Sequence, residues 1–367
     1  MEAIGRRLPN RFRAGDEWLV ARTIALVGAF HPGAAQLALA LEDEPEVERI
    51  LGLQRAPAPL LGPKFEHVAA EPGDERFDAA VAQADVVVIF PVLEIGRDGR
   101  PARERLGASV RRTLDAAQGA STVVLWSSGV VYGAHPDNPV PLDEQAATRP
   151  NFDFPPARAL ADAEQLVLDS ADAAGAARRV VLRSSAIWSP VWGSFLSRML
   201  VGPAIVSVKG HNPPVQSLDP QDAVSALLLA ISGRLAGGVY NVAPDDWVPA
   251  DQAARLTGRR RVEVPEAAAF AVGDRLASLG VALTGQGELH YHMHPWVLSN
   301  RRLREAGWAP ARTTSEAMTA AGQAIPEGVR VGRVQVRRSD VVRGAAAAVA
   351  FVAALAALVR RSRSGGT

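Results

Sequence analysis

The segment that decides the fold reads TIALVGAFHPGAAQLALAL and spans residues 23–41. It opens with a short apolar run, turns at Gly28 and continues from Ala34 with apolar residues at helical spacing. An apolar run of this length is typical of a buried strand, and the spacing after the turn is typical of an amphipathic helix. The segment therefore predicts a strand, a glycine turn and a helix, which is how a βαβ unit begins.

The rest of the chain repeats this alternation. Four more short apolar runs are typical of buried strands, at residues 49–53, 85–90, 122–126 and 180–182. Alanine-rich helical stretches separate them, so the fold class is α/β, with a Rossmann-type doubly wound parallel sheet. Beyond residue 190 the pattern loosens into helices at 194–200 and 219–231 and a strand at 238–243. We expect this part to form a smaller C-terminal substrate lobe over the carboxyl edge of the sheet.

Composition divides the chain and narrows its class. The expected parts are an N-terminal extension (1–20), a Rossmann-like domain (21–190), a substrate lobe interleaved with the sheet (191–325), a basic linker (326–343) and an apolar tail helix with a basic end (344–367). With 48% hydrophobic and 22% charged residues the chain is typical of a globular protein. A net charge of +1 with interleaved signs gives no basic face for nucleic acid.

Two further features concern the compartment. The chain has no cysteine, which excludes disulfides, thiolate nucleophiles and cysteine-ligated metals and is consistent with a reducing compartment. The first twenty residues carry charges throughout and contain no long apolar run, so no secretory signal is expected. We therefore expect the bulk of the chain to lie in the cytoplasm.

Four landmarks follow one another along the chain. They are LVGAFHPGA after the first strand, WSSGVVYG after the strand at 122–126, GVYNVAPDDW, and LREAGWAP near residue 310. In these features, from about residue 23 to 318, the chain resembles the extended short-chain dehydrogenase/reductase family, in its NAD-dependent epimerase/dehydratase branch. The resemblance implies NAD or NADP as cofactor, a structural role for Tyr132, and a homodimer formed through helices of the main sheet.

The same resemblance places the family's catalytic groups. Its serine corresponds to Ser128, four residues before Tyr132, whereas its tyrosine and lysine correspond to Pro156 and Leu160. The family's reaction needs a phenol whose pKa is lowered by a neighbouring ammonium, so that it can exchange a proton with the substrate oxygen. Proline and leucine supply neither group, and no Tyr-x-x-x-Lys sequence occurs in the chain. The resemblance therefore indicates a degenerate member.

The family's glycine turn is altered as well. Its three positions read Gly28, His31 and Ala34, with Gly33 next to the third. Glycines let a backbone approach a pyrophosphate at the helix N-terminus, whereas His31 and Pro32 add bulk and remove a donor there. We expect Gly28 and Gly33 to form what remains of the phosphate site, with weakened binding.

Replacements continue around the adenosine part of the implied site. The usual acidic residue for the ribose corresponds to Gln54, followed by Arg55, while Glu71 corresponds to an aspartate that contacts adenine. A helix start that normally carries an asparagine matches residues 106–110, which read LGASV. Because changes gather at one site, we interpret them as a loss of dehydrogenase function. Gln54, Arg55 and Glu71 remain candidate cofactor contacts.

Other polar and aromatic groups have simpler interpretations. His290, His292 and His294 alternate in HYHMHP and would share one face of a strand, but with only Glu288 nearby we expect no metal site. Ser127 and Ser128 lack a nucleophile elbow and are expected to line the site. For Trp188, Trp192 and Phe195, packing of the smaller lobe is favoured over an aromatic lining for a substrate.

The C-terminal run at 344–359 has two interpretations that the sequence leaves open. As a helix its 16 residues span about 24 Å, short of the ~30 Å hydrocarbon core of a membrane. Three arginines that follow could bind anionic headgroups, which favours membrane association through 344–361. The alternative is a helix docked on the protein's own surface.

Three functional hypotheses follow. The leading hypothesis is a catalytically inactive or atypical protein that acts as a binding or regulatory module for an unidentified protein partner or small molecule. The second is an active NAD(P)-dependent oxidoreductase or epimerase on a sugar nucleotide or sterol-like substrate, with Ser128 and an unrecognised acid. The third is a sensor that binds a dinucleotide without turnover.

Overall fold

The computed structural model describes residues 23–55, 61–91, 100–174, 177–189, Trp192, 204–270, 286–324, 328–331 and 334–337. The expected N-terminal extension, the helix at 194–200 and the apolar tail lie outside these residues. Among the helices that the structure describes, none combines the length and the apolar character that a membrane crossing needs.

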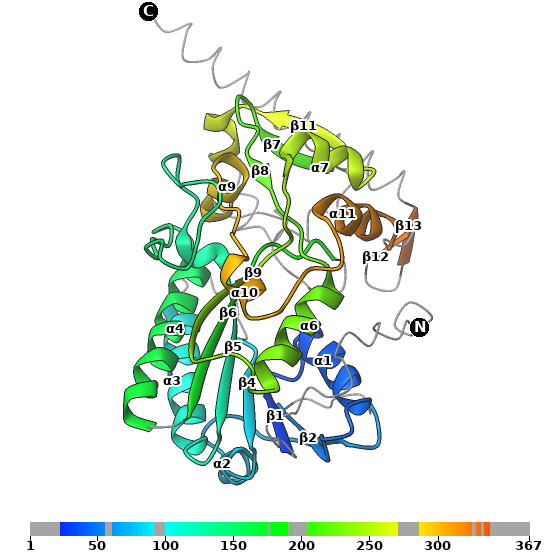
Figure 1. The fold of residues 1–367 in the computed structure, drawn as a ribbon. Helices are drawn as coiled ribbons and strands as arrows, with labels where there is room; N and C mark the ends of the chain where they lie inside the picture. The colour runs from blue at the N-terminus through cyan, green and yellow to red at the C-terminus, as the bar shows by residue number, and fades with distance from the viewer. Residues whose placement is uncertain are drawn as a thin grey trace, which may run out of the picture.

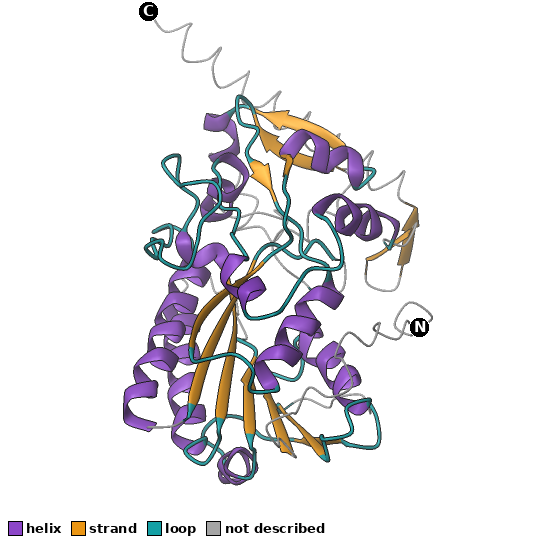
Figure 2. Cartoon of the chain, in the orientation of Figure 1, coloured by secondary structure: helices purple, strands orange, loops and turns teal. Residues whose placement is uncertain are grey.

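A seven-stranded parallel sheet forms the centre of the molecule (Figure 2). In spatial order its strands are β3 (Phe65–Val68), β2 (Arg49–Leu53), β1 (Thr23–Val27), β4 (Val86–Ile89), β5 (Thr122–Ser128), β6 (Arg178–Ser184) and β9 (Gly238–Val242). The direction in which successive strands are added reverses at β1, because β2 and β3 lie on one side of it and β4, β5 and β6 lie on the other. In doubly wound sheets, ligands bind outside the carboxyl ends of the strands at this point. The predicted Rossmann-type sheet is confirmed.

Helices cover both faces of the sheet (Figure 1). One face carries α2 (Glu75–Ala82), α3 (Arg100–Ala116) and α4 (Pro155–Ala174); the other carries α1 (Pro32–Glu42) and α6 (Pro220–Ile231). Both faces need a covering layer, because the successive side chains of a strand point to opposite faces of the sheet, as those of β1 do. Ala25 and Val27 pack in the core under α2, α3 and α4, and Ile24 and Leu26 pack in the core under α1 and α6.

The second part of the chain forms a lobe beyond the carboxyl ends of β5 and β6, in the upper half of Figure 1. Its elements are β7 (Ala204–Val208), β8 (Pro214–Val215), β10 (Val248–Pro249), α7 (Ala250–Leu256), β11 (Arg260–Val264), α9 (Gln286–Met293) and α11 (Thr314–Gln323). Strand β7 pairs with β11, and β8 pairs with β10. Strand β9 returns to the central sheet, and α10 (Arg301–Glu305) lies beside it.

Strand β3 and the basic linker differ from expectation. Strand β3 was not predicted from the sequence, because FEHV has apolar residues only at its ends. It lies at the sheet edge, where one side of the strand has no partner strand. Within the expected basic linker, β12 (Gly328–Val331) and β13 (Val334–Arg337) pair as antiparallel strands. The expected domain borders remain predictions.

Candidate functional site

The turn after β1 depends on Gly28. Its φ of +81° lies in the left-handed region, and its amide donates to Leu53 O at 3.2 Å. A β-carbon at Gly28 would lie 2.3 Å from the carbonyl oxygen of Phe90, the residue that follows β4. The turn therefore passes directly against the end of the neighbouring strand, and glycine is required there for packing within the protein itself.

His31 caps the helix that follows. It has extended backbone angles, and its Nδ1 accepts a hydrogen bond from the Gly33 amide at 3.1 Å. Burial lowers the pKa of His31 to about 4, so the ring is neutral at pH 7 and carries its proton on Nε2. Free amides at a helix N-terminus are the groups that bind a phosphate. Here the chain's own imidazole occupies one of them.

Two aromatic rings enclose this imidazole. His31 stacks on Phe90, with ring centroids 5.1 Å apart, and meets Trp192 edge to face at 5.7 Å. The indole Nε1 of Trp192 donates to Gln36 Oε1 on α1 at 2.8 Å. A β-carbon at Gly33 would lie 2.7 Å from Trp192 Cη2, so the indole rests on the glycine. We call His31, Phe90 and Trp192 the aromatic plug.

The aromatic plug lies where this fold binds a dinucleotide. In sheets of this type the pyrophosphate contacts the glycine turn and the N-terminus of the first helix. The residues present do not fit that group, since Gly33 donates its amide to His31 and lies under Trp192. The bulk at His31 was predicted from the sequence, but the contribution of Trp192 was not, because its hydrogen-bond partner Gln36 lies 156 positions earlier.

Because Trp192 packs on Gly33, the effect of Gly33→Ala on the free energy of unfolding should depend on the residue at position 192. Gly33→Ala should lower the free energy of unfolding by about 1–3 kcal/mol, because the new methyl overpacks against the indole. In a Trp192→Leu background the same change should be neutral or stabilising by up to ~1 kcal/mol, because alanine is the better helix former. Urea unfolding of the four proteins measures both terms, and an equal cost in the two backgrounds would contradict the contact.

The three candidate contacts for adenosine lie together at the ends of β2 and β3. Gln54 is buried, and its backbone amide donates to Val68 O at 3.2 Å. Arg55 and Glu71 form an exposed ion pair with 3.1 Å between Nη2 and Oε2. By contrast, residues 106–110 lie inside α3 and not at its start, and Leu106 is buried in the core beneath it.

Ser128 lies at the end of β5 without an acid or base partner from α4. Its hydroxyl caps the short helix η2 (Gly129–Tyr132), at 3.4 Å from the Val130 amide, and donates a long bond of 3.5 Å to Ser184 O. Pro156 is the second residue of α4, and Leu160 is buried in the adjoining apolar core. The positions of the family's tyrosine and lysine therefore hold a helix start and a core residue.

The chain's three tyrosines are all committed elsewhere. Their hydroxyls donate to fixed oxygens: Tyr132 to Asn241 Oδ1 at 2.9 Å, Tyr291 to Val130 O at 2.7 Å and Tyr240 to Ala236 O at 3.1 Å. Burial raises the pKa of both Tyr132 and Tyr291, so these phenols stay protonated. None of them resembles the activated phenol that hydride chemistry of this family needs.

The two lysines are also remote from this position in the fold. Lys64 precedes β3 at the amino edge of the sheet, opposite to Ser128, and its Nζ donates to Glu44 O at 2.7 Å. Lys209 is exposed and follows β7 in the lobe. No lysine side chain therefore comes from α4 to lower the pKa of a phenol or orient a bound ribose.

A buried charged network lies behind Ser128 and was missed from the sequence. Glu164 Oε2 accepts from Arg183 Nε at 3.0 Å and Nη2 at 2.7 Å, and its other oxygen accepts from the Ser127 hydroxyl. The Arg183 guanidinium also lies 4.7 Å from the centroid of the Tyr132 ring. Glu164 follows Leu160 by one helical turn, so helix periodicity was the signal that could have placed it at this site.

The histidine prediction requires a correction. His290 and His292 belong to helix α9 and not to a strand, so residues two positions apart do not share a face. His290 Nε2 lies 3.0 Å from Asp153 Oδ2, and its ring stacks at 6.4 Å from that of His294. Within the described part of the chain, no group of three or more His, Cys, Asp or Glu side chains has the geometry of a metal site.

The tryptophans of this region have separate roles. Trp192 is a packing residue, but it packs against α1 in the aromatic plug and not within the smaller lobe as predicted, whereas Phe195 lies outside the described residues. Trp188 is 4% exposed and lines a cavity between the end of β6 and the lobe. Packing was expected for Trp188 too, and this cavity was not predicted from the sequence.

Comparison with solved structures identifies the fold. A short-chain dehydrogenase/reductase superfamily protein from Agrobacterium tumefaciens, crystallised with NAD, is 21% identical with a TM-score of 0.61, over 83% of this chain and 97% of that chain. A dTDP-glucose 4,6-dehydratase from Bacillus anthracis in complex with NAD is 15% identical with a TM-score of 0.63, over 83% and 96%. The chain therefore has the fold of the NAD-dependent epimerases and dehydratases of this superfamily.

The relatives found by sequence match a smaller part of the chain than the solved structures do. Uncharacterised proteins of Mycobacterium tuberculosis and Mycobacterium bovis are each 29% identical to it over 207 residues. That match covers 53% of this chain and 52% of each relative, so the chain spans about half the length of the curated relatives it matches. No protein-family model matches the chain.

Proposed function

We propose that this chain is a binding module built on the dehydrogenase fold, without dinucleotide-dependent hydride transfer. The observation that carries the proposal is the aromatic plug, because His31 and Trp192 take the amide and the space that a pyrophosphate would use at Gly33. The NAD in the solved relatives belongs to those proteins. Here the fold is retained as a scaffold.

The surroundings of Ser128 support the same proposal. Hydride transfer in this family needs a proton donor with a lowered pKa beside the serine. Pro156 and Leu160 occupy the positions from which α4 would supply it, and the buried phenols of Tyr132 and Tyr291 have raised pKa values. The cytoplasmic location, the homodimer and the membrane association of the tail remain predictions from the sequence.

A hydride-transfer assay tests the proposal. We expect no reduction of NAD or NADP and no epimerisation when the full chain is incubated with UDP-glucose, dTDP-glucose or a hydroxysteroid. The matched control is Ser128→Ala, which changes the residual serine and should give the same null result. Turnover in the wild-type chain that Ser128→Ala abolishes would overturn the proposal and restore the oxidoreductase hypothesis.

A further inference from the structure

Four of the chain's seven histidines gather where α9 and the segment after it meet the end of β7. His211 follows β7, His290 lies in α9, and His294 follows His290 by one helical turn, with its amide donating to His290 O at 2.9 Å. The ring centroid of His294 lies 5.6 Å from that of His211 and 6.4 Å from that of His290. We call these three residues the histidine cluster, and His135 is the fourth histidine beside it.

The imidazoles of His211 and His290 are each held by a hydrogen bond, and each has a carboxylate nearby. His211 Nδ1 lies 3.1 Å from Met293 O, and because a carbonyl oxygen only accepts, Nδ1 carries the proton of that bond. The other ring nitrogen of His211, Nε2, lies 3.7 Å from Glu266 Oε2. His290 Nε2 lies 3.0 Å from Asp153 Oδ2. A positive charge on either ring is therefore balanced by a carboxylate.

His294 differs from both, because its ring forms no hydrogen bond with any residue that the structure describes. The titratable groups that face it are His211, His290, His135 and Glu266. Burial lowers the pKa of His294 below its ordinary value, the three imidazoles lower it further, and Glu266 acts in the opposite direction. His294 is therefore the member of the histidine cluster whose protonated form the fold disfavours.

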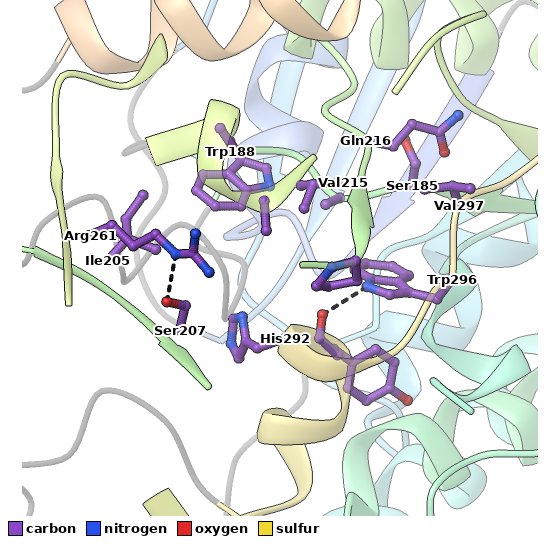
Figure 3. Close-up of a pocket in the computed structure, with 15 residues that line it drawn as sticks. Ser185, Trp188, Ile205, Ser207, Val215, Gln216, Arg261, His292, Trp296 and Val297 are labelled. Carbon is purple, nitrogen blue, oxygen red and sulfur yellow. Dashed lines mark hydrogen bonds between the residues drawn. The ribbon is translucent and has the colours of Figure 1, made fainter. Parts of the chain in front are cut away.

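Two arginines near the histidine cluster are already paired with carboxylates. Arg261 of β11 donates to Ser207 Oγ at 2.8 Å, a bond drawn in Figure 3, and lies 3.0 Å from Glu263 Oε1. Arg149 lies beside the fourth histidine and bonds both carboxylate oxygens of Asp137, at 3.0 and 3.2 Å. Histidine is the side chain whose ordinary pKa lies between about pH 5 and 8. In that range the charge of this region therefore changes mainly through the histidines.

The histidine cluster lies at one end of a small apolar contact between α9 and β7. Leu289 and Met293 of α9 pack with Val208 of β7 and with Ala269, and this group is separate from the larger apolar cores of the molecule. The hydrogen bond from His211 to Met293 O closes the same end of the contact. An element that is held by few buried apolar contacts can open locally without unfolding of the rest of the protein.

We propose that the histidine cluster makes the contact between α9 and β7 sensitive to pH, so that protonation of His294 beside two other imidazoles loosens the end of α9 below about pH 6. The pKa of His294 is lower in the closed contact than in an open one. Its contribution to closure is therefore fully present above the ordinary pKa of ~6.5 and is lost as the pH falls toward the lowered pKa. The inference goes beyond the proposed function, because it concerns how the lobe responds to pH and does not depend on what the module binds.

Hydrogen exchange of the full chain tests the inference, when it is followed by mass spectrometry at about pH 7.5 and about pH 5.5 and corrected for the intrinsic exchange rate at each pH. Protection of the amides of α9 should fall about threefold to tenfold at the lower pH. Tenfold is the approximate ceiling, because a single group with an ordinary pKa of ~6.5 can shift an equilibrium by no more than that at one pH unit below it. Protection of β5, in the interior of the central sheet, should be unchanged.

His294→Gln keeps a polar side chain that cannot become charged, so it should abolish the loss of protection in α9. The matched control is His67→Gln, because His67 lies in β3 at the edge of the sheet, with its Nε2 3.1 Å from Gln54 O, and this variant should respond as the wild type does. The inference is overturned if α9 keeps its protection at the lower pH, if His294→Gln loses as much protection as the wild type, if His67→Gln also abolishes the response, or if β5 loses protection to the same extent as α9. None of these outcomes involves a dinucleotide, so the proposed function can stand when the inference fails.

Discussion

Replacement of Glu164 by leucine is expected to lower the free energy of unfolding by about 3–5 kcal/mol, because it leaves a buried guanidinium without its counter-charge. The side chains of Glu164 and Arg183 are 3% and 6% exposed and share two hydrogen bonds. Ser127 loses its acceptor in the same change. Chemical denaturation monitored by circular dichroism measures the loss.

Two controls separate burial from charge. In Glu164→Leu with Arg183→Met both charges are removed, and most of the lost stability should return, since an apolar pair of similar size can replace a buried ion pair. Asp162→Leu breaks an ion pair with Arg103 on the exposed side of the same helix and should cost at most ~1 kcal/mol. Equal costs for the buried and exposed pairs would contradict this account of the network.

Gly28→Ala should destabilise the protein by about 2–5 kcal/mol, the sum of a left-handed backbone penalty of ~1–2 and an overpacking cost of ~1–3. The reason is the 2.3 Å approach between the new β-carbon and Phe90 O, at a φ of +81°. Because that oxygen belongs to the backbone, relief requires movement of the strand end.

Gly210 isolates the two contributions to the cost at Gly28. It has a nearly equal φ of +89°, but a β-carbon there would have nothing within 4 Å. Gly210→Ala should therefore show only the backbone penalty of about 1–2 kcal/mol. If thermal unfolding gave the same loss for both variants, the close approach at Gly28 would be without consequence.

The sequence predicted most closely those features that local pattern determines. The bounds of β1 and β2 match the predicted runs, because strands buried on both faces are continuous apolar segments. Alternating histidines were misleading at α9, where Leu289 and Met293 are both buried one helical turn apart. The four-residue spacing of these apolar residues was the better signal.

Contacts between distant segments were beyond the reach of the sequence. The aromatic plug joins His31 with Phe90 at the end of β4 and Trp192 from beyond β6. No local sequence pattern predicts which aromatic ring packs against Gly33. The cavity beside Trp188 could not be predicted either, because its walls come from segments that are far apart in the sequence.

The central claim is that the chain's own side chains replace a dinucleotide at the N-terminus of α1. Isothermal titration calorimetry of NAD, NADH, NADP and NADPH into the full chain tests it most directly. We predict no saturable binding of any of the four up to millimolar concentration, because Gly33 is capped by His31 and covered by Trp192. Saturable binding with a micromolar or lower Kd would contradict the account, since the aromatic plug would then have to open for the cofactor.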